Sequence, residues 1–275
     1  MSQESPRNEI RRATVRYEVP GMDDVAVRHD VEYAATDEGA LTMDLYLPPG
    51  ADGAAVPAVV LVSGYPDPGY EAVLGCKFKE TGWSVSWGRL LAASGLAAVT
   101  YTNHDPIADL DRLLDHLRGG DSPGIDVDRL ALSACSGNVP RALAALMDSD
   151  GALACATLSY GFTLDAAGST HVADAAAQFR FVNPCAGRTV ADLPDDLPIH
   201  VVRAGADEMP GLNAALDRFT ADALDRNLPL TVVNLAASPH AFDLHDDSEA
   251  SRATIRQSLD FLRAHLLGVD AGPTR

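Results

Sequence analysis

Short apolar segments rich in β-branched residues alternate with helical segments along most of this chain, and no other property narrows the choice of folds as much. Eight segments are expected to form strands: 27–33, 41–47, 56–62, 96–102, 130–133, 154–160, 199–204 and 230–235. Most of them show little polar alternation, which is typical of strands buried on both faces. The sequence therefore predicts an α/β fold with a mostly parallel eight-stranded sheet flanked by helices.

The helical segments lie mainly between the later strands. They are expected at 86–93, 108–117, 139–147, 172–179 and 212–224, and around an apolar stripe of Ile255, Leu259, Leu262 and Leu266. The first two strands have no helix between them, so we expect an antiparallel hairpin at one edge of the sheet.

The domain organisation follows from the segments that do not fit the alternation of strands and helices. Residues 1–25 are polar and predict an N-terminal arm, whereas 26–275 have the length of one ordinary α/β domain. The stretch 161–198 is too long for a structureless loop in a compact domain. We interpret it as a small helical cap insertion, and an ordinary surface excursion is the alternative.

Charge and composition exclude several classes of function. The chain has 39 acidic and 21 basic residues, of which only Lys77 and Lys79 are lysines. Without a basic stripe, binding to nucleic acid or to an anionic membrane is disfavoured. No apolar signal segment or membrane span is visible.

Cysteine usage points to a reduced chain. The cysteines are scattered without the spacing of a metal site, at Cys76, Cys135, Cys155 and Cys185. We therefore expect a reduced, cytoplasmic protein without a cysteine-based metal site. The chain could also form a homo-oligomer.

Residues 128–143 contain the strongest functional signal, because a buried strand passes through small residues directly into a helix: D-R-L-A-L-S-A-C-S-G-N-V-P-R-A-L. A nucleophile elbow has this layout, in which a strained turn exposes the nucleophile and the following helix offers backbone N–H groups to an oxyanion. Two adjacent side chains, Cys135 and Ser136, compete for the role of nucleophile.

The flanking residues separate the two candidates. Cys135 has the better small neighbour on the helix side, Gly137, whereas Ser136 lies between Ala134 and Asn138. The number of residues from Arg129 to the turn matches the usual strand register for Ser136. We therefore predict Ser136 as the nucleophile and keep Cys135 as the alternative.

The other members of a Ser–acid–His triad are expected after the last two strands. Asp207 follows the seventh strand in a glycine-containing turn, with Glu208 as second choice, although Asp207 could instead cap the next helix. His240 follows the eighth strand and could take the serine proton, and His245 is the weaker candidate.

The oxyanion hole needs a second donor from the loop after the third strand. Ser63 and Gly64 stand there, where hydrolases often carry His-Gly. The backbone N–H groups of Tyr65 and Gly137 are the expected donors.

These motifs, in this order, resemble the α/β-hydrolase superfamily over roughly residues 27–268. The segment M-D-L-Y-L-P at 43–48 resembles the edge strand of its esterases. The segment P-H-A-F at 239–242 is similar to the histidine motif of the dienelactone hydrolases, which use a cysteine nucleophile. The resemblance implies an α/β-hydrolase fold and acyl-enzyme chemistry on a small-molecule acyl substrate, without a metal or an organic cofactor.

Three functions follow as hypotheses. The first is a serine hydrolase that cleaves a carboxylic ester, lactone or thioester through a Ser-Asp-His triad, or through Cys135 in a dienelactone hydrolase-like variant. The second is acyl transfer or cyclisation at the same site in a biosynthetic pathway, and the third is a non-catalytic binding protein on this scaffold. Aromatic residues that could line the substrate pocket are Tyr65, Tyr70, Trp83, Trp87, Phe162 and Phe179.

Overall fold

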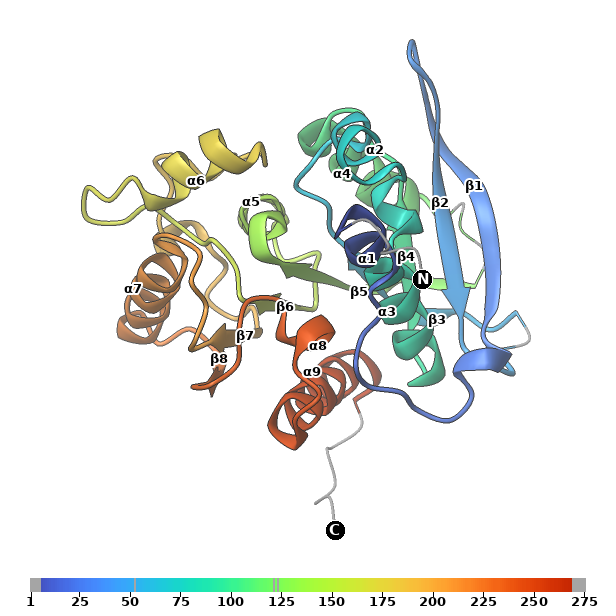
Figure 1. The fold of residues 1–275 in the computed structure, drawn as a ribbon. Coiled ribbons are helices and arrows are strands. Elements are labelled where there is room, and N and C mark those ends of the chain that lie inside the picture. The colour runs from blue at the N-terminus through green and yellow to red at the C-terminus, as the bar shows by residue number, and fades with distance from the viewer. Residues whose placement is uncertain (1–5, 52, 121, 123, 269–275) are drawn as a thin grey trace.

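An eight-stranded sheet forms the centre of the computed structural model, which describes residues 6–51, 53–120, 122 and 124–268 (Figure 1). The strands are β1 (Ala26–Thr36), β2 (Gly39–Leu47), β3 (Val56–Leu61), β4 (Ala97–Tyr101), β5 (Ile125–Cys135), β6 (Cys155–Ser159), β7 (Ile199–Ala204) and β8 (Leu230–Leu235). Their order is β1-β2-β4-β3-β5-β6-β7-β8. Strands β3 to β8 run parallel, and β1 and β2 form an antiparallel edge hairpin. The predicted fold class is confirmed.

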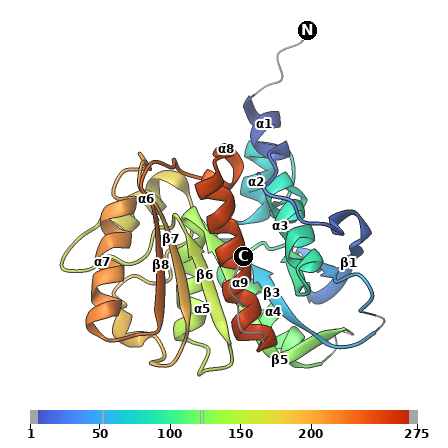
Figure 2. The ribbon, with the colours of Figure 1, turned by 90° about the horizontal axis from the view of Figure 1, so that it is seen from below.

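Helices cover both faces of this sheet (Figure 2). They are α1 (Pro6–Arg12), α2 (Asp67–Leu74), α3 (Gly82–Ala93), α4 (Pro106–Arg118), α5 (Val139–Met147), α6 (His171–Phe179), α7 (Leu212–Asp225), α8 (Phe242–His245) and α9 (Glu249–Leu267). Helices α4, α5 and α7 pack in one apolar cluster, and α3 and α9 pack in a second cluster on the opposite face. The central strands supply both clusters because their side chains alternate between the two faces: Val60 belongs to the first and Val59 to the second.

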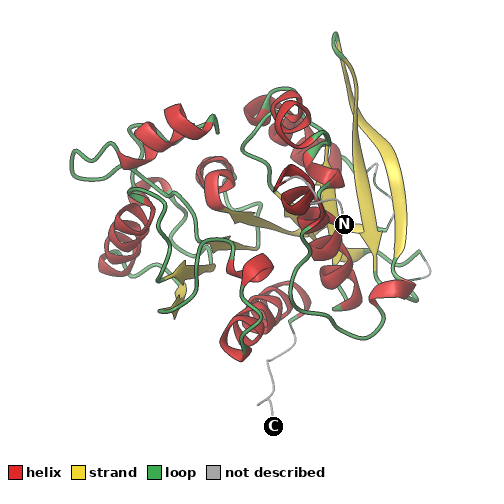
Figure 3. Cartoon of the chain, in the orientation of Figure 1, coloured by secondary structure: helices red, strands yellow, loops and turns green. Residues whose placement is uncertain are grey.

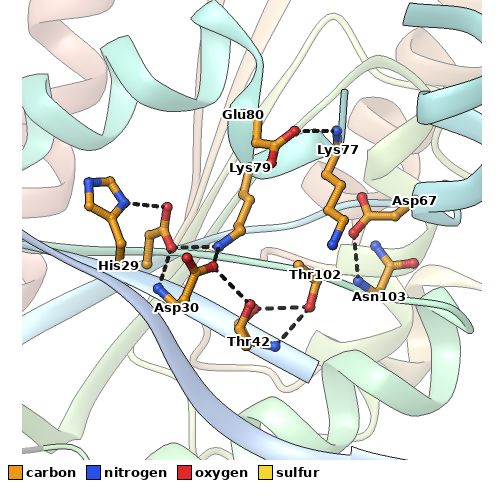
Figure 4. A network of polar contacts seen from close by, with 10 residues as sticks. His29, Asp30, Thr42, Asp67, Lys77, Lys79, Glu80, Thr102 and Asn103 are labelled. Carbon is orange, nitrogen blue, oxygen red and sulfur yellow. Dashed lines mark hydrogen bonds and ion pairs between the residues drawn. The ribbon is translucent and has the colours of Figure 1, made fainter. Parts of the chain in front are cut away.

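An ion-pair network around the buried Lys79 fixes the short 3₁₀ helix Phe78–Glu80 to the edge hairpin (Figure 4). The Lys79 side chain is 5% exposed, and its Nζ donates to Asp30 at 2.5 Å and to Asp44 at 2.6 Å. The Asp67 carboxylate accepts the backbone N–H of Phe78 at 3.0 Å and that of Asn103 at 3.0 Å. These contacts hold the start of α2 and Phe78 in fixed positions beside the carboxyl ends of the central strands.

The segment 161–198 contains α6, the 3₁₀ helix Val190–Asp192 and long connecting loops (Figure 3). Both carboxylate oxygens of Asp165 accept backbone N–H groups at the start of α6, from Val172 and Ala173. Helix α6 packs on α7 through a small apolar cluster that includes Phe162 and Phe181. The returning chain is tied to the loop after β3, where the N–H of Val182 donates to Gly64 O at 2.9 Å.

The described part of the N-terminal segment packs along the domain. Its backbone lies so close to the start of α3 that a Cβ atom on Gly82 would fall 2.6 Å from Ala13 O. Val15 and Val25 are buried in the cluster that contains α3 and α9. Residues 1–5 of the predicted arm lie outside the described residues. Over those that are described, no helix has the length and apolar character needed to cross a membrane.

His200 on β7 should make the folded protein sensitive to mild acid. The side chain is 1% exposed, stacks on Phe261 and shares a hydrogen bond with Ser258. Burial lowers the pKa of His200 to about 4. An unfolded histidine binds a proton near pH 6.5, so the folded state loses stability as pH falls from 6.5 towards 4.

The expected loss from this one group between pH 7 and pH 5 is about 2 kcal/mol of unfolding free energy. Urea unfolding at the two pH values measures it, with the non-titrating variant His200→Gln as the reference. An equal pH dependence in the variant and the wild type would contradict the prediction.

Candidate active site

The turn between β5 and α5 has the strained geometry of a nucleophile elbow. Ser136 has a φ of 54°, in the left-handed region that non-glycine residues rarely adopt. It begins the 3₁₀ helix Ser136–Asn138, which runs directly into α5. A Cβ atom on Gly137 would lie 2.4 Å from the Tyr65 hydroxyl, so a larger residue would force the Tyr65 and Phe181 side chains to move. The strand-to-helix connection thus holds the Ser136 hydroxyl above the end of the sheet.

Two further polar side chains meet this serine. The Ser136 Oγ lies 2.9 Å from His240 Nε2, and His240 Nδ1 lies 2.6 Å from Asp207 Oδ2. The Asp207 side chain has no exposed area, and its second oxygen accepts the N–H of Met209 at 2.9 Å. With Nδ1 donating to the carboxylate, Nε2 is left as the acceptor for the serine proton. Three residues far apart in the sequence therefore form a continuous hydrogen-bonded chain.

The loops that carry Asp207 and His240 brace one another. The N–H of Gly205 donates to Leu235 O at 2.7 Å, and that of Ala206 donates to Ser238 O at 3.0 Å. A Cβ atom on Gly205 would fall 2.5 Å from Ala236 O, so the two loops need glycine at this contact. This close contact sets the distance between the carboxylate and the imidazole.

The alternative candidates for the acid, the histidine and the nucleophile lie outside this hydrogen-bonded chain. Glu208 is exposed, and so is His245 on α8. Cys135 contacts the Asn138 amide at 3.8 Å, and burial raises the pKa of its thiol to about 12. Among the described residues, no histidine is hydrogen-bonded to that thiol. The geometry thus brings Ser136, Asp207 and His240 together and leaves Cys135 as a neutral thiol beside them.

The predicted oxyanion loop lies against the elbow. The N–H of Gly64 donates to the side-chain oxygen of Asn138 at 2.8 Å, and a Cβ on Gly64 would fall 2.5 Å from Gly137 O. The N–H of Tyr65 makes a long contact of 3.4 Å with Ser63 Oγ. No sequence pattern predicts the bond between Asn138 and Gly64, although a buried amide at a helix start indicates a partner.

Gly64→Ala should disturb this contact. The added methyl group meets backbone atoms of Gly137 and Asn138, so the loop must move away from the elbow. The displaced loop carries Tyr65, one of the two expected oxyanion donors. We therefore expect any catalysis at Ser136 to slow about 10²- to 10³-fold, the cost of losing one such donor. Steady-state kinetics on the folded variant measures this effect, and an unchanged kcat would contradict it.

A largely apolar cavity of about 600 Å³ opens beside Ser136 and His240. It is lined by Tyr65, Tyr70, Val73, Leu74, Phe78, Trp83 and Phe179, with Ile10 of α1 and Arg180 also on its lining. Of the predicted pocket aromatics, Trp87 lines a separate, smaller cavity, and Phe162 is buried in the apolar cluster between α6 and α7. The described residues contain no cluster of His, Cys, Asp or Glu able to hold a metal ion.

Comparison with known proteins gives different results for the sequence and for the fold. The sequence matches no protein-family model and no curated protein. Solved structures do match. A fungal esterase from Rhizomucor miehei is 15% identical, with a TM-score of 0.66 over 93% of this chain and 86% of its own. The chain has the α/β-hydrolase fold.

Two further solved structures give the same result. A thermophilic esterase from Thermogutta terrifontis is 17% identical, with a TM-score of 0.66, 93% of this chain covered and 97% of that chain. An ester hydrolase from the metagenome of Lake Arreo is 20% identical, with a TM-score of 0.64 and coverages of 90% and 88%. The architecture is thus shared over nearly the whole chain at low sequence identity.

Proposed function

We propose that this α/β-hydrolase-fold chain is a serine hydrolase of carboxylic esters in which Ser136 is the nucleophile, His240 the general base and Asp207 the orienting acid. The observation that carries the proposal is the relay from Asp207 to His240 to Ser136, with distances of 2.6 and 2.9 Å, at a strained elbow. The esterases that share the fold support the choice of an ester as substrate.

The mechanism follows from the placement of these groups. The Ser136 oxygen attacks the ester carbonyl while His240 Nε2 takes its proton, and the carbonyl oxygen becomes an oxyanion near the start of α5. Backbone N–H groups of Tyr65 and Gly137 are the proposed donors to that oxyanion. His240 then protonates the leaving alcohol, and water releases the acid from the acyl-enzyme.

The lining of the cavity indicates the kind of substrate. Its wall is formed mainly by aromatic and aliphatic side chains, such as Tyr70, Leu74 and Phe78. A chain of methylene groups gains about 0.8 kcal/mol for each CH₂ removed from water. We therefore propose a short to medium apolar acyl group as the preferred substrate group, with lactones and thioesters as related substrates.

The test combines a probe with a substrate panel. A fluorophosphonate should label the intact protein at Ser136, located by peptide mass spectrometry, and p-nitrophenyl esters of increasing chain length should be hydrolysed. Labelling of Cys135 instead would assign the role of nucleophile to that cysteine. If the protein neither takes the probe nor hydrolyses any ester or thioester, a non-catalytic binding role would replace the proposed function.

A further inference from the structure

A buried carboxylate lies three residues after His240 and has no part in the relay. Asp243 is 2% exposed, and its two oxygens accept three side-chain hydrogen bonds. Trp83 Nε1 and Trp87 Nε1 donate to Oδ2 at 2.8 and 2.9 Å, and the Tyr160 hydroxyl donates to Oδ1 at 2.8 Å. These are the only two tryptophans in the chain. A buried carboxylate with three donors forms strong, directional contacts.

Tyr160 connects that carboxylate to the imidazole of His240. It directly follows β6 and has a positive φ of 37°, which places its ring edge-on to His240 at a centroid distance of 5.1 Å. Burial raises the pKa of Tyr160 well above its usual value, so its hydroxyl remains a donor to Asp243. The position of the ring that contacts His240 is therefore set by Asp243.

Helix α8, on which Asp243 lies, is also held by the N-terminal segment. The N–H of Arg16 donates to Asp243 O at 2.7 Å, and its Nε donates to Leu244 O at 2.9 Å. Helix α8, which follows the His240 loop directly, is thus fixed to α3 through the indoles, to the end of β6 through Tyr160, and to the N-terminal segment.

We infer that Asp243 is a positioning residue, which keeps His240 within hydrogen-bonding distance of Ser136 by fixing both the Tyr160 ring and helix α8. This inference rests on the proposed role of His240. Replacing the carboxylate with an amide leaves one oxygen for three donors and turns an NH₂ group towards other donors. The ring and the helix should then move, and a displacement of about 1 Å at a reacting group can cost about 10²-fold in rate.

Two variants test the inference in the full-length protein. Asp243→Asn disrupts the acceptor, whereas Tyr160→Phe keeps the ring and removes the hydroxyl that donates to Asp243 and also contacts the Cys135 thiol. Asp247→Asn is the matched control, because that exposed carboxylate contacts only the surface Arg252 among the described residues. The measurements are kcat and KM for a p-nitrophenyl ester, the rate constant of fluorophosphonate labelling, and tryptophan emission.

We expect kcat and the labelling rate to fall about 10²-fold in Asp243→Asn and about tenfold in Tyr160→Phe, with KM within about twofold of the wild type. Tryptophan emission should shift in Asp243→Asn, because both indoles lose their charged acceptor. Asp247→Asn should match the wild type throughout. If Asp243→Asn does not fold, Tyr160→Phe decides the outcome alone.

The inference is overturned if the folded variants keep wild-type kcat and labelling rates. It is also overturned if only KM rises, because the network would then shape the pocket and not the position of His240. Wild-type protein that neither hydrolyses esters nor takes the probe would overturn the proposed function and this inference together. Normal wild-type activity with unaffected variants would overturn this inference alone.

Discussion

Ser136→Ala is expected to lower kcat/KM for ester hydrolysis by about 10⁴- to 10⁶-fold. The substitution removes the oxygen that lies 2.9 Å from His240 Nε2, and it leaves the positive φ of the elbow to a residue with the same Cβ. The loss should therefore appear in kcat with little loss of folding stability. Steady-state kinetics and thermal unfolding of the same preparation measure both quantities, and fluorophosphonate labelling should disappear.

Cys135→Ala is the matched comparison, because it removes the neighbouring nucleophilic atom from the same turn. The raised pKa of that thiol keeps it protonated at neutral pH, so kcat should stay within about tenfold of the wild type. A reversal of the two results, with Ser136→Ala active and Cys135→Ala inactive, would assign the reaction to the cysteine.

The sheet can be predicted because the apolar composition of each central strand indicates that both of its faces are buried. A segment such as Val56–Leu61 is apolar on both faces, and only a strand covered on both sides suits it. The ends of the strands are harder to predict. Strand β5 begins at Ile125, five residues before the expected start at 130, because Ile125 and Asp126 pair with the first two residues of β3. That pairing depends on the neighbouring strand and leaves no periodic signal in the sequence.

Helices α1 and α2 are not predicted by the sequence. Asp67–Leu74 contains a proline and a glycine near its start, and its eight residues offer only a weak apolar stripe. Its position depends on the Asp67 carboxylate, which bonds backbone groups of Phe78 and Asn103. Such long-range contacts decide the structure of short elements, for which local propensity is a weak guide.

The residues of the relay can be identified because chain order and strand position both point to them. Ser136, Asp207 and His240 each follow a parallel strand, and the carboxyl ends of those strands meet at one edge of the sheet. The supporting contacts cannot be found in the same way. In the sequence, Asn138 and Asp243 look like ordinary helix-start residues, and only the folded chain places them against Gly64 and the two tryptophans.

Asp207→Asn should lower kcat by about 10³- to 10⁴-fold. The carboxylate accepts the His240 Nδ1 proton at 2.6 Å, which leaves Nε2 free to accept the serine proton. An amide NH₂ at that place would donate to Nδ1 and favour the tautomer that carries its proton on Nε2. Such an imidazole cannot take the Ser136 proton, so the loss should fall on kcat and on the fluorophosphonate labelling rate.

Glu208→Gln provides the matched control, since it changes the adjacent, exposed carboxylate that is the second choice for the acid on sequence grounds. Its kcat should equal that of the wild type. Asp207 does not cap α7, which begins at Leu212 after Gly211 without a side-chain cap. The pair still separates catalysis from a purely structural role, because the amide introduced by Asp207→Asn retains an oxygen for the N–H of Met209, which Asp207 Oδ1 accepts at 2.9 Å. If Asp207 only fixed the turn at Met209, Asp207→Asn would keep wild-type kcat, and a large loss in Glu208→Gln would assign the acid to Glu208 instead.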